Sequence, residues 1–166
     1  IIFAIPKSDT NLIDYLKNKN YKYFLGSETN VRDRYIKAAE NNSIEKIVRV
    51  TSDCPLIDPF IVDECIKKSK KFEYISNNTP PDISDYANGS DVEVFSKDLL
   101  KLSAEIFPNS KDKEHVTFPF WDGRMKIKSF RMKKKISDKS IRITLDYKND
   151  LIVLKKILES SKNLYI

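Results

Sequence analysis

The feature that most constrains the fold is an apolar, β-branched run that ends in a proline. Residues 46–58 read Lys-Ile-Val-Arg-Val-Thr-Ser-Asp-Cys-Pro-Leu-Ile-Asp. Such a run is typical of a strand buried between helices. Pro55 ends it, because proline lacks the amide that a sheet ladder needs. We therefore expect Asp53 at the carboxyl end of a central strand, the edge at which open α/β sheets bind ligands.

An arginine lies inside this apolar strand. Alternation along the strand places Arg49, Thr51 and Asp53 on one side. A buried arginine is costly unless it meets an anionic partner. Two interpretations stay open: a structural salt bridge beside an ordinary strand-end aspartate, or a functional anchor for a bound anion.

Strand and helix patterns alternate along the first half of the chain. Strand patterns at 1–5, 21–25, 46–50 and 72–76 are separated by helix patterns at 9–18, 31–41 and 59–71, the last of which is expected to bury Phe60. This alternation indicates βαβ units and a parallel sheet. The second half adds strand patterns at 91–95, 124–132 and 141–146 and helices at 97–102 and 148–160, and some of these strands are expected to be antiparallel. The prediction is a three-layer α/β fold with a mostly parallel mixed sheet, in one domain over residues 1–166.

Composition excludes several classes of protein. With 40% hydrophobic and 33% charged residues, the chain is expected to be globular, and no apolar run is long enough to span a membrane. The two cysteines give no disulfide framework, which favours a cytoplasmic protein. The formal net charge of +6 lies largely in residues 124–139. We interpret that run as a solvated sheet edge. A surface for an anionic ligand and a nucleic-acid-binding surface are the two less favoured interpretations.

The central stretch also resembles a known signature. Together with Phe24-Leu-Gly-Ser, Val31-Arg-Asp-Arg-Tyr, Asp91-Val-Glu-Val-Phe, Glu114-His-Val-Thr and Arg142-Ile-Thr-Leu-Asp, it is similar to the cytidylyltransferases of the spore-coat polysaccharide synthesis type. These are related to the acylneuraminate and 3-deoxy-manno-octulosonate cytidylyltransferases. The resemblance implies the nucleotide-diphospho-sugar transferase type of fold. Related enzymes open with a strand, a glycine-containing phosphate loop and a helix, and none of these is present here, so we expect an uncovered strand edge or apolar groove.

Asp53 and Asp146 each follow a strand pattern, and two carboxylates at one sheet edge suit Mg²⁺. In the resembled family, matching aspartates hold the metal that bridges the nucleotide phosphates, and Arg49 joins them as a third candidate catalytic residue. The resemblance also implies two binding sets. The nucleotide-binding candidates are Ser27, Asp33, Arg34 and Thr51, and the substrate-binding candidates are Asp91, Glu93 and His115.

Each candidate has a simpler explanation. Asp146 could cap the helix that follows, and Asp33 and Arg34 could form an ordinary helix-surface pair. Asp91 and Glu93 share one strand face, which could be solvated, or could hold a cation or sugar hydroxyls between the two acids. The single histidine, His115, could be a packed residue with no role in chemistry.

The resemblance implies transfer of CMP from CTP to a sugar acid or sugar phosphate, with release of pyrophosphate. The expected partners are CTP, Mg²⁺ and a small sugar, with neither nucleic acid nor membrane, and a homodimer is left open. The alternative is a non-catalytic module that keeps the sugar pocket or a partner surface without the triphosphate loop.

Overall fold

The computed structural model describes residues 1–162. The chain divides into two compact units, and the division passes through β3 (Lys46–Arg49) and β5 (Glu93–Ser96). The first unit comprises Ile1–Ile47 and Phe95–Ile127, and the second comprises Val48–Val94 and Lys128–Ile166. The expectation of one domain over residues 1–166 stays a prediction.

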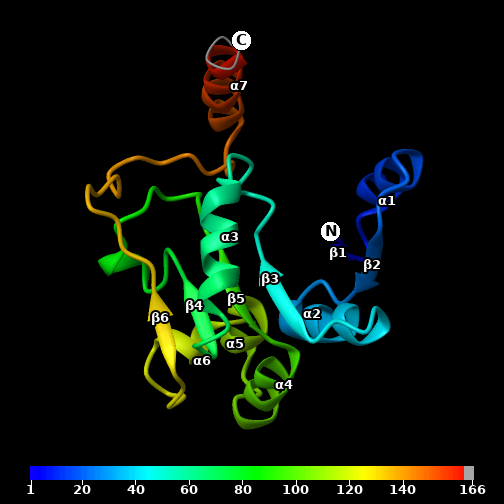
Figure 1. Cartoon of the computed structure of the whole chain (residues 1–166). Helices are drawn as coiled ribbons and strands as arrows, with labels where there is room; N and C mark the ends of the chain where they lie inside the picture. The colour runs from blue at the N-terminus through cyan, green and yellow to red at the C-terminus, as the bar shows by residue number, and fades with distance from the viewer. Residues whose placement is uncertain (163–166) are drawn as a thin grey trace. The chain divides into compact units, whose positions relative to one another are not determined.

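The first unit begins with a β-α-β-α sequence (Figure 1). β1 (Phe3–Pro6) and β2 (Tyr23–Gly26) form a parallel two-stranded sheet, as the alternation of patterns predicted. α1 (Thr10–Asn18) buries Ile13 and Leu16 against Ile5 of β1. α2 (Val31–Asn41) packs on both strands. Both helices begin where the sequence offers a capping side chain, Asp9 for α1 and Asn30 for α2.

Three further helices complete this unit: α4 (Lys97–Ile106), α5 (Ser110–His115) and α6 (Phe118–Trp121). α2 packs against α4 and α5. Its Arg32 is buried and donates to the carbonyls of Ser103 at 3.2 Å and Phe107 at 2.6 Å, which satisfies the end of α4. Asp112 of α5 is fully buried and accepts two hydrogen bonds from Arg124, which holds the pKa of that carboxyl below its usual range.

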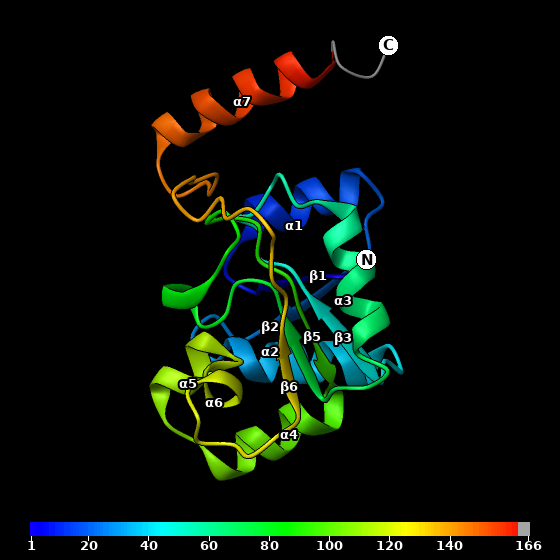
Figure 2. The ribbon, with the colours of Figure 1, turned by 60° about the vertical axis from the view of Figure 1, so that its left-hand side comes forward.

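The second unit carries α3 (Pro59–Lys68), β4 (Tyr74–Ser76), a short 3₁₀ turn (Pro81–Ile83), β6 (Ser129–Arg131) and α7 (Lys148–Lys162). The strand order of the four-stranded sheet is β3-β5-β4-β6, and β6 runs parallel to β4 (Figure 1). Figure 2 labels β3, β5 and β6 of this sheet. α3 packs beside β4. Its Cys65 is fully buried with Ile75, Val92 and Val94 in one apolar cluster.

β6 lies at the edge of its sheet, as expected, and runs parallel to β4. Three other expectations about local structure were wrong. β3 is an edge strand of its sheet and not a central one, and its Val48 is 38% exposed. Phe60 is 79% exposed, because it lies in the first turn of α3. Residues 141–146 form no strand, only an isolated bridge between Arg142 and Asn88, since their backbone groups bond irregular segments. None of the helices within residues 1–162 has the length and apolar character needed to cross a membrane.

Candidate active site

Two aspartates from different parts of the second unit meet at one buried thiol. The Sγ atom of Cys54 lies 3.4 Å from Oδ2 of Asp91 and 3.8 Å from Oδ1 of Asp53. It also lies 3.3 Å from the hydroxyl of Thr51. Burial raises the pKa of the Cys54 thiol to about 12, so the thiol stays protonated and can donate a hydrogen bond to a carboxylate. The two carboxylates are thus brought together by an uncharged donor.

The segment that carries Asp146 lies against the same place. The amide of Leu145 donates to the carbonyl of Asp53 at 2.9 Å. Gly89 permits the close approach, because a Cβ at that position would lie 2.5 Å from the backbone nitrogen of Thr144, and Gly89 has a φ of +99°. The backbone therefore joins the regions of Asp53 and Asp146, although Asp146 does not follow a strand.

The carboxylate of Asp146 is exposed and pairs with Arg142 at 2.6 Å. The neighbouring Asp150 accepts hydrogen bonds from the amides of Asp146 and Tyr147, at 2.9 Å and 2.8 Å, and bonds Arg142 as well. These bonds hold the pKa of Asp150 well below its usual range. The role of backbone cap ahead of α7 thus falls to Asp150, and the side chain of Asp146 faces an arginine.

The side chains of Asp53 and Asp146 carry the kind of donor atom that a magnesium ion binds. Asp53 and Asp146 offer carboxylate oxygens, which a hard cation prefers, and Mg²⁺ completes its shell with water and substrate phosphates. Within residues 1–162, no group of three or more His, Cys, Asp and Glu residues could hold a metal by itself. The hydroxyl of Thr144, two residues before Asp146, is buried without a hydrogen-bond partner in the described part of the chain. Such an atom is expected where a ligand or water completes a site.

Asp91 and Glu93 differ sharply in their surroundings. Glu93 is only 2% exposed and pairs with Arg49, so the anionic partner that the sequence required for this arginine is Glu93. Glu93 also accepts a hydrogen bond from the Tyr74 hydroxyl at 2.5 Å. Burial raises the pKa of Asp91, and a hydrogen bond from the Asn78 amide opposes that rise. A fully solvated face is therefore excluded for this pair.

The sequence analysis did not single out Tyr74, Asn78 or Cys54, each of which contacts a candidate acid. Cys54 adjoins Asp53 in the signature stretch, and this adjacency was an available signal. Tyr74 and Asn78 lie 19 and 13 residues before the acids they contact. Nothing in their local pattern distinguishes them from ordinary residues of a strand and a loop.

The other candidates lie in the first unit. The Oγ of Ser27 accepts from the Asn30 amide at 3.0 Å, and Arg34 donates to the Ser27 carbonyl at 2.7 Å. Arg34 also packs so closely on Gly26 that a Cβ there would lie 2.7 Å from its Cγ. Desolvation lowers the pKa of Arg34. Asp33 pairs with Lys37 at 2.8 Å, one turn along α2, as a helix-surface pair would.

His115 ends α5 and is exposed, with its ring centroid 6.2 Å from that of Phe118. It is therefore not a packed core histidine. The next residue, Val116, is fully buried with a φ of +51°. The amide of Thr117 donates to the carbonyl of His115 at 2.5 Å, which closes a tight turn of a kind that is rare and strained.

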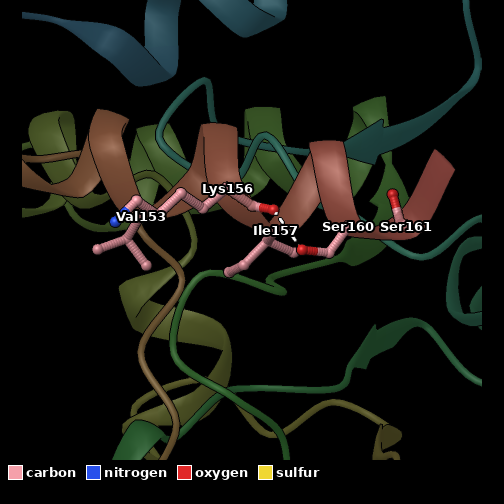
Figure 3. Close-up of a pocket in the computed structure, with 5 residues that line it drawn as sticks. All are labelled: Val153, Lys156, Ile157, Ser160 and Ser161. Carbon is pink, nitrogen blue, oxygen red and sulfur yellow. Dashed lines mark hydrogen bonds between the residues drawn. The ribbon is translucent and has the colours of Figure 1, made fainter. Parts of the chain in front are cut away.

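A surface depression runs along α7 and does not involve the acids. Val153, Lys156, Ile157, Ser160 and Ser161 line it (Figure 3). The Ser160 hydroxyl donates to the Lys156 carbonyl at 2.9 Å, as the dashed line in Figure 3 shows. The lining comes from one helix and offers few polar groups, so we assign it no chemistry.

Two known proteins are similar to this chain in sequence. An uncharacterised protein of Methanocaldococcus jannaschii is 29% identical over 164 residues, which is 96% of this chain and 64% of that protein. The spore coat polysaccharide biosynthesis protein SpsF of Bacillus subtilis is 32% identical over 82 residues, or 45% of this chain and 34% of that protein. The chain thus spans less than two thirds of the length of either relative. No family model matches the chain.

Two solved structures share the fold. A cytidylyltransferase from Leptospira borgpetersenii superposes with a TM-score of 0.79 at 24% identity, covering 95% of this chain and 74% of that one. A 4-diphosphocytidyl-2C-methyl-D-erythritol synthase from Anaerococcus prevotii has a TM-score of 0.64 at 16% identity, covering 96% and 81%. The chain therefore has the α/β fold of the nucleotide-diphospho-sugar transferase type. Both solved structures are of cytidylyltransferases, so the fold is the one that the motif resemblance implied.

Proposed function

We propose that this chain carries the catalytic region of a cytidylyltransferase, which transfers CMP from CTP to a sugar acid or sugar phosphate and releases pyrophosphate. One observation carries the proposal: Asp53 and Asp91 meet at Cys54, while the backbone before Asp146 bonds the carbonyl of Asp53. The segments that carry these three acids thus lie together, which supports a metal-dependent transfer to phosphorus. The cytidylyltransferase of the same fold supports the class of reaction, and a sugar acceptor is proposed because SpsF acts in polysaccharide biosynthesis.

In this reaction the acceptor oxygen attacks the α-phosphorus, and the bond to the pyrophosphate oxygen breaks in line with it. Mg²⁺, held by Asp53 and Asp146, would neutralise charge on the phosphates. Asp91 lies beside Asp53 and accepts a hydrogen bond from the acceptor. Glu93 is buried and paired with Arg49, so Arg49 acts near the site as the counter-charge of Glu93. Thr51 orients the thiol that both aspartates share.

The nucleotide is proposed to contact residues of the first unit. Arg34 fixes the backbone at Ser27, and its partly buried guanidinium is suited to a flat or anionic group of the ligand. Asp33 belongs to the same nucleotide set. For Thr51 of the second unit and exposed His115 of the first, the nucleotide and acceptor roles are proposed from the motif resemblance alone. We further propose that the protein acts in the cytoplasm on small molecules, without nucleic acid or membrane partners, and that a homodimer is the oligomeric state to test first.

The experiment is a pyrophosphate-release assay on the full-length natural protein. CTP, UTP, ATP and GTP are each supplied with Mg²⁺ and one of three acceptors: N-acetylneuraminate, 3-deoxy-manno-octulosonate or glucose 1-phosphate. We expect release with CTP. Asp53→Asn should reduce turnover by at least about 100-fold while leaving the unfolding transition in place. Sugar binding without pyrophosphate release from any nucleotide would favour the non-catalytic alternative.

A further inference from the structure

The loop from Asn77 to Ser90 is fastened to the two acids at the start of β5. The first residues of this loop are densely bonded. The side chain of Asn77 donates to the Ser90 carbonyl at 2.6 Å and accepts from the Val92 amide at 2.8 Å, which ties the two ends of the loop together. The Asn78 amide then donates to Oδ1 of Asp91 at 2.5 Å. One side of the loop is thus set by Asp91.

A second connection runs from the next loop residue to Glu93. The hydroxyls of Thr79 and Tyr74 lie 2.5 Å apart, and the Tyr74 hydroxyl donates to Oε1 of Glu93, also at 2.5 Å. Because the single hydroxyl proton of Tyr74 goes to the carboxylate, the Thr79 hydroxyl must be the donor to Tyr74. Arg49 pairs with the other carboxylate oxygen of Glu93. Tyr74 and Glu93 are each 2% exposed, so this chain of bonds is shielded from water.

Two consecutive loop residues therefore bond two neighbouring acids. Asn78 bonds Asp91, just before β5, and Thr79 connects through Tyr74 to Glu93, the first residue of β5. The direction of every bond is fixed by chemistry, since a carboxylate only accepts and Tyr74 has one proton. Burial makes each bond costly to break without a replacement. The loop is held in one position relative to Asp91.

We propose that Thr79 is a positioning residue for the acceptor sugar, acting through Tyr74 and Glu93. Glu93 does not reach the sugar, because Tyr74 and Arg49 occupy its two oxygens, and Asp91 is the acid of this strand that binds the acceptor. This inference rests on the proposed function. The loop adjoins Asp91 because Asn78 bonds it, so releasing Thr79 is expected to displace the loop from the acceptor while the aspartate side chains themselves stay unchanged.

The test compares Thr79→Val, which keeps the shape of the side chain but removes its hydroxyl, with Thr79→Ser, which keeps the hydroxyl. Asn88→Ala is the matched control, because Asn88 is an exposed residue of the same loop. Steady-state kinetics on the full-length natural protein use CTP and whichever of the three acceptors named above gives the highest wild-type rate. Amide hydrogen exchange across residues 81–90 follows the loop itself and needs no activity.

We expect Thr79→Val to raise the acceptor KM about ten-fold or more, with the CTP KM unchanged and exchange faster only in the loop. Thr79→Ser and Asn88→Ala should match the wild type in both measurements. Unchanged loop exchange in Thr79→Val would overturn the inference. Equal losses towards CTP and acceptor, or faster exchange throughout the second unit, would also overturn it, because Thr79 would then support only the fold. A wild type that releases no pyrophosphate defeats the proposed function instead, while the exchange data still decide whether Thr79 holds the loop.

Discussion

Replacing Arg49 by methionine separates the two interpretations that the sequence left open for this residue. The side chain of Glu93 is 3% exposed and that of Arg49 is 17% exposed, so their ion pair is largely buried. Arg49→Met leaves the Glu93 carboxylate buried without its counter-charge. Breaking a buried pair from one side costs about 3–5 kcal/mol. We therefore expect the free energy of unfolding to fall by about that amount.

The double variant sharpens the expectation. Glu93→Gln removes the charge but can still accept the Tyr74 hydroxyl, so in the Arg49→Met background it should restore about 2 kcal/mol or more of the loss. Lys67→Met is the control, because Lys67 forms an exposed pair with Glu64 within α3. Its cost should be at most about 1 kcal/mol.

The measurement is urea denaturation of the three variants and the wild type at neutral pH, with pyrophosphate release followed in parallel. If Arg49→Met lost less than about 1 kcal/mol yet abolished turnover, the arginine would be an anchor for substrate phosphate. A double variant no more stable than Arg49→Met would also refute the ion-pair account, because the stranded charge would not be the source of the loss.

Two more perturbations test the geometry around the aspartates. Burial raises the pKa of Asp91, so its ionised form costs stability above that pKa, and the cost disappears as the pH falls below the ordinary carboxyl range. Asp91→Asn should therefore stabilise the ligand-free protein near pH 7 and give no advantage at acid pH, as thermal unfolding at several pH values would show; an advantage independent of pH would contradict this. Gly89→Ala should cost about 1–3 kcal/mol from its positive φ and more from the contact with Thr144, whereas Gly123→Ala has a φ of +87° but open space around it and should show the strain alone. Equal losses in chemical denaturation would mean that the segments at Gly89 and Thr144 do not need to touch.

Local chemistry explains which parts of the fold could be predicted. The helix starts at Asp9, Asn30 and Ser96 each depend on a side chain that bonds an amide two or three residues further on. That information lies within one turn of the sequence. Residues 141–146 have the apolar alternation of a strand, but their partners are Asn88 and Asp53, which are irregular and distant in sequence. A strand depends on its neighbour, and the pattern of one segment cannot supply that neighbour.

The candidate site also has features that the local sequence predicts and features that depend on distant residues. The apolar surroundings of Arg49 were enough to require an anion, because burying a lone charge is costly wherever it occurs. They could not select Glu93 over Asp91, since both acids alternate onto the same face. The choice depends on depth, and depth is set by how Tyr74 and the loop cover the strand. Asn78 shows the limit most clearly, because its role exists only through a contact with Asp91.

The acids of the candidate site are Asp53, Asp91, Glu93 and Asp146, and their charges are compensated within the chain to different extents. Carboxylates held close together repel one another. Two of the four acids have a partner within the chain, Glu93 in Arg49 and Asp146 in Arg142. The remaining two, Asp53 and Asp91, share the Cys54 thiol, and Asp91 has a raised pKa. An incoming Mg²⁺ would have to compete with Arg142 for Asp146, and the arginine would then be released beside the metal. If the proposed function holds, nucleotide phosphates would bind both the metal and the freed guanidinium, so we expect Mg²⁺ and CTP to bind together more tightly than either alone.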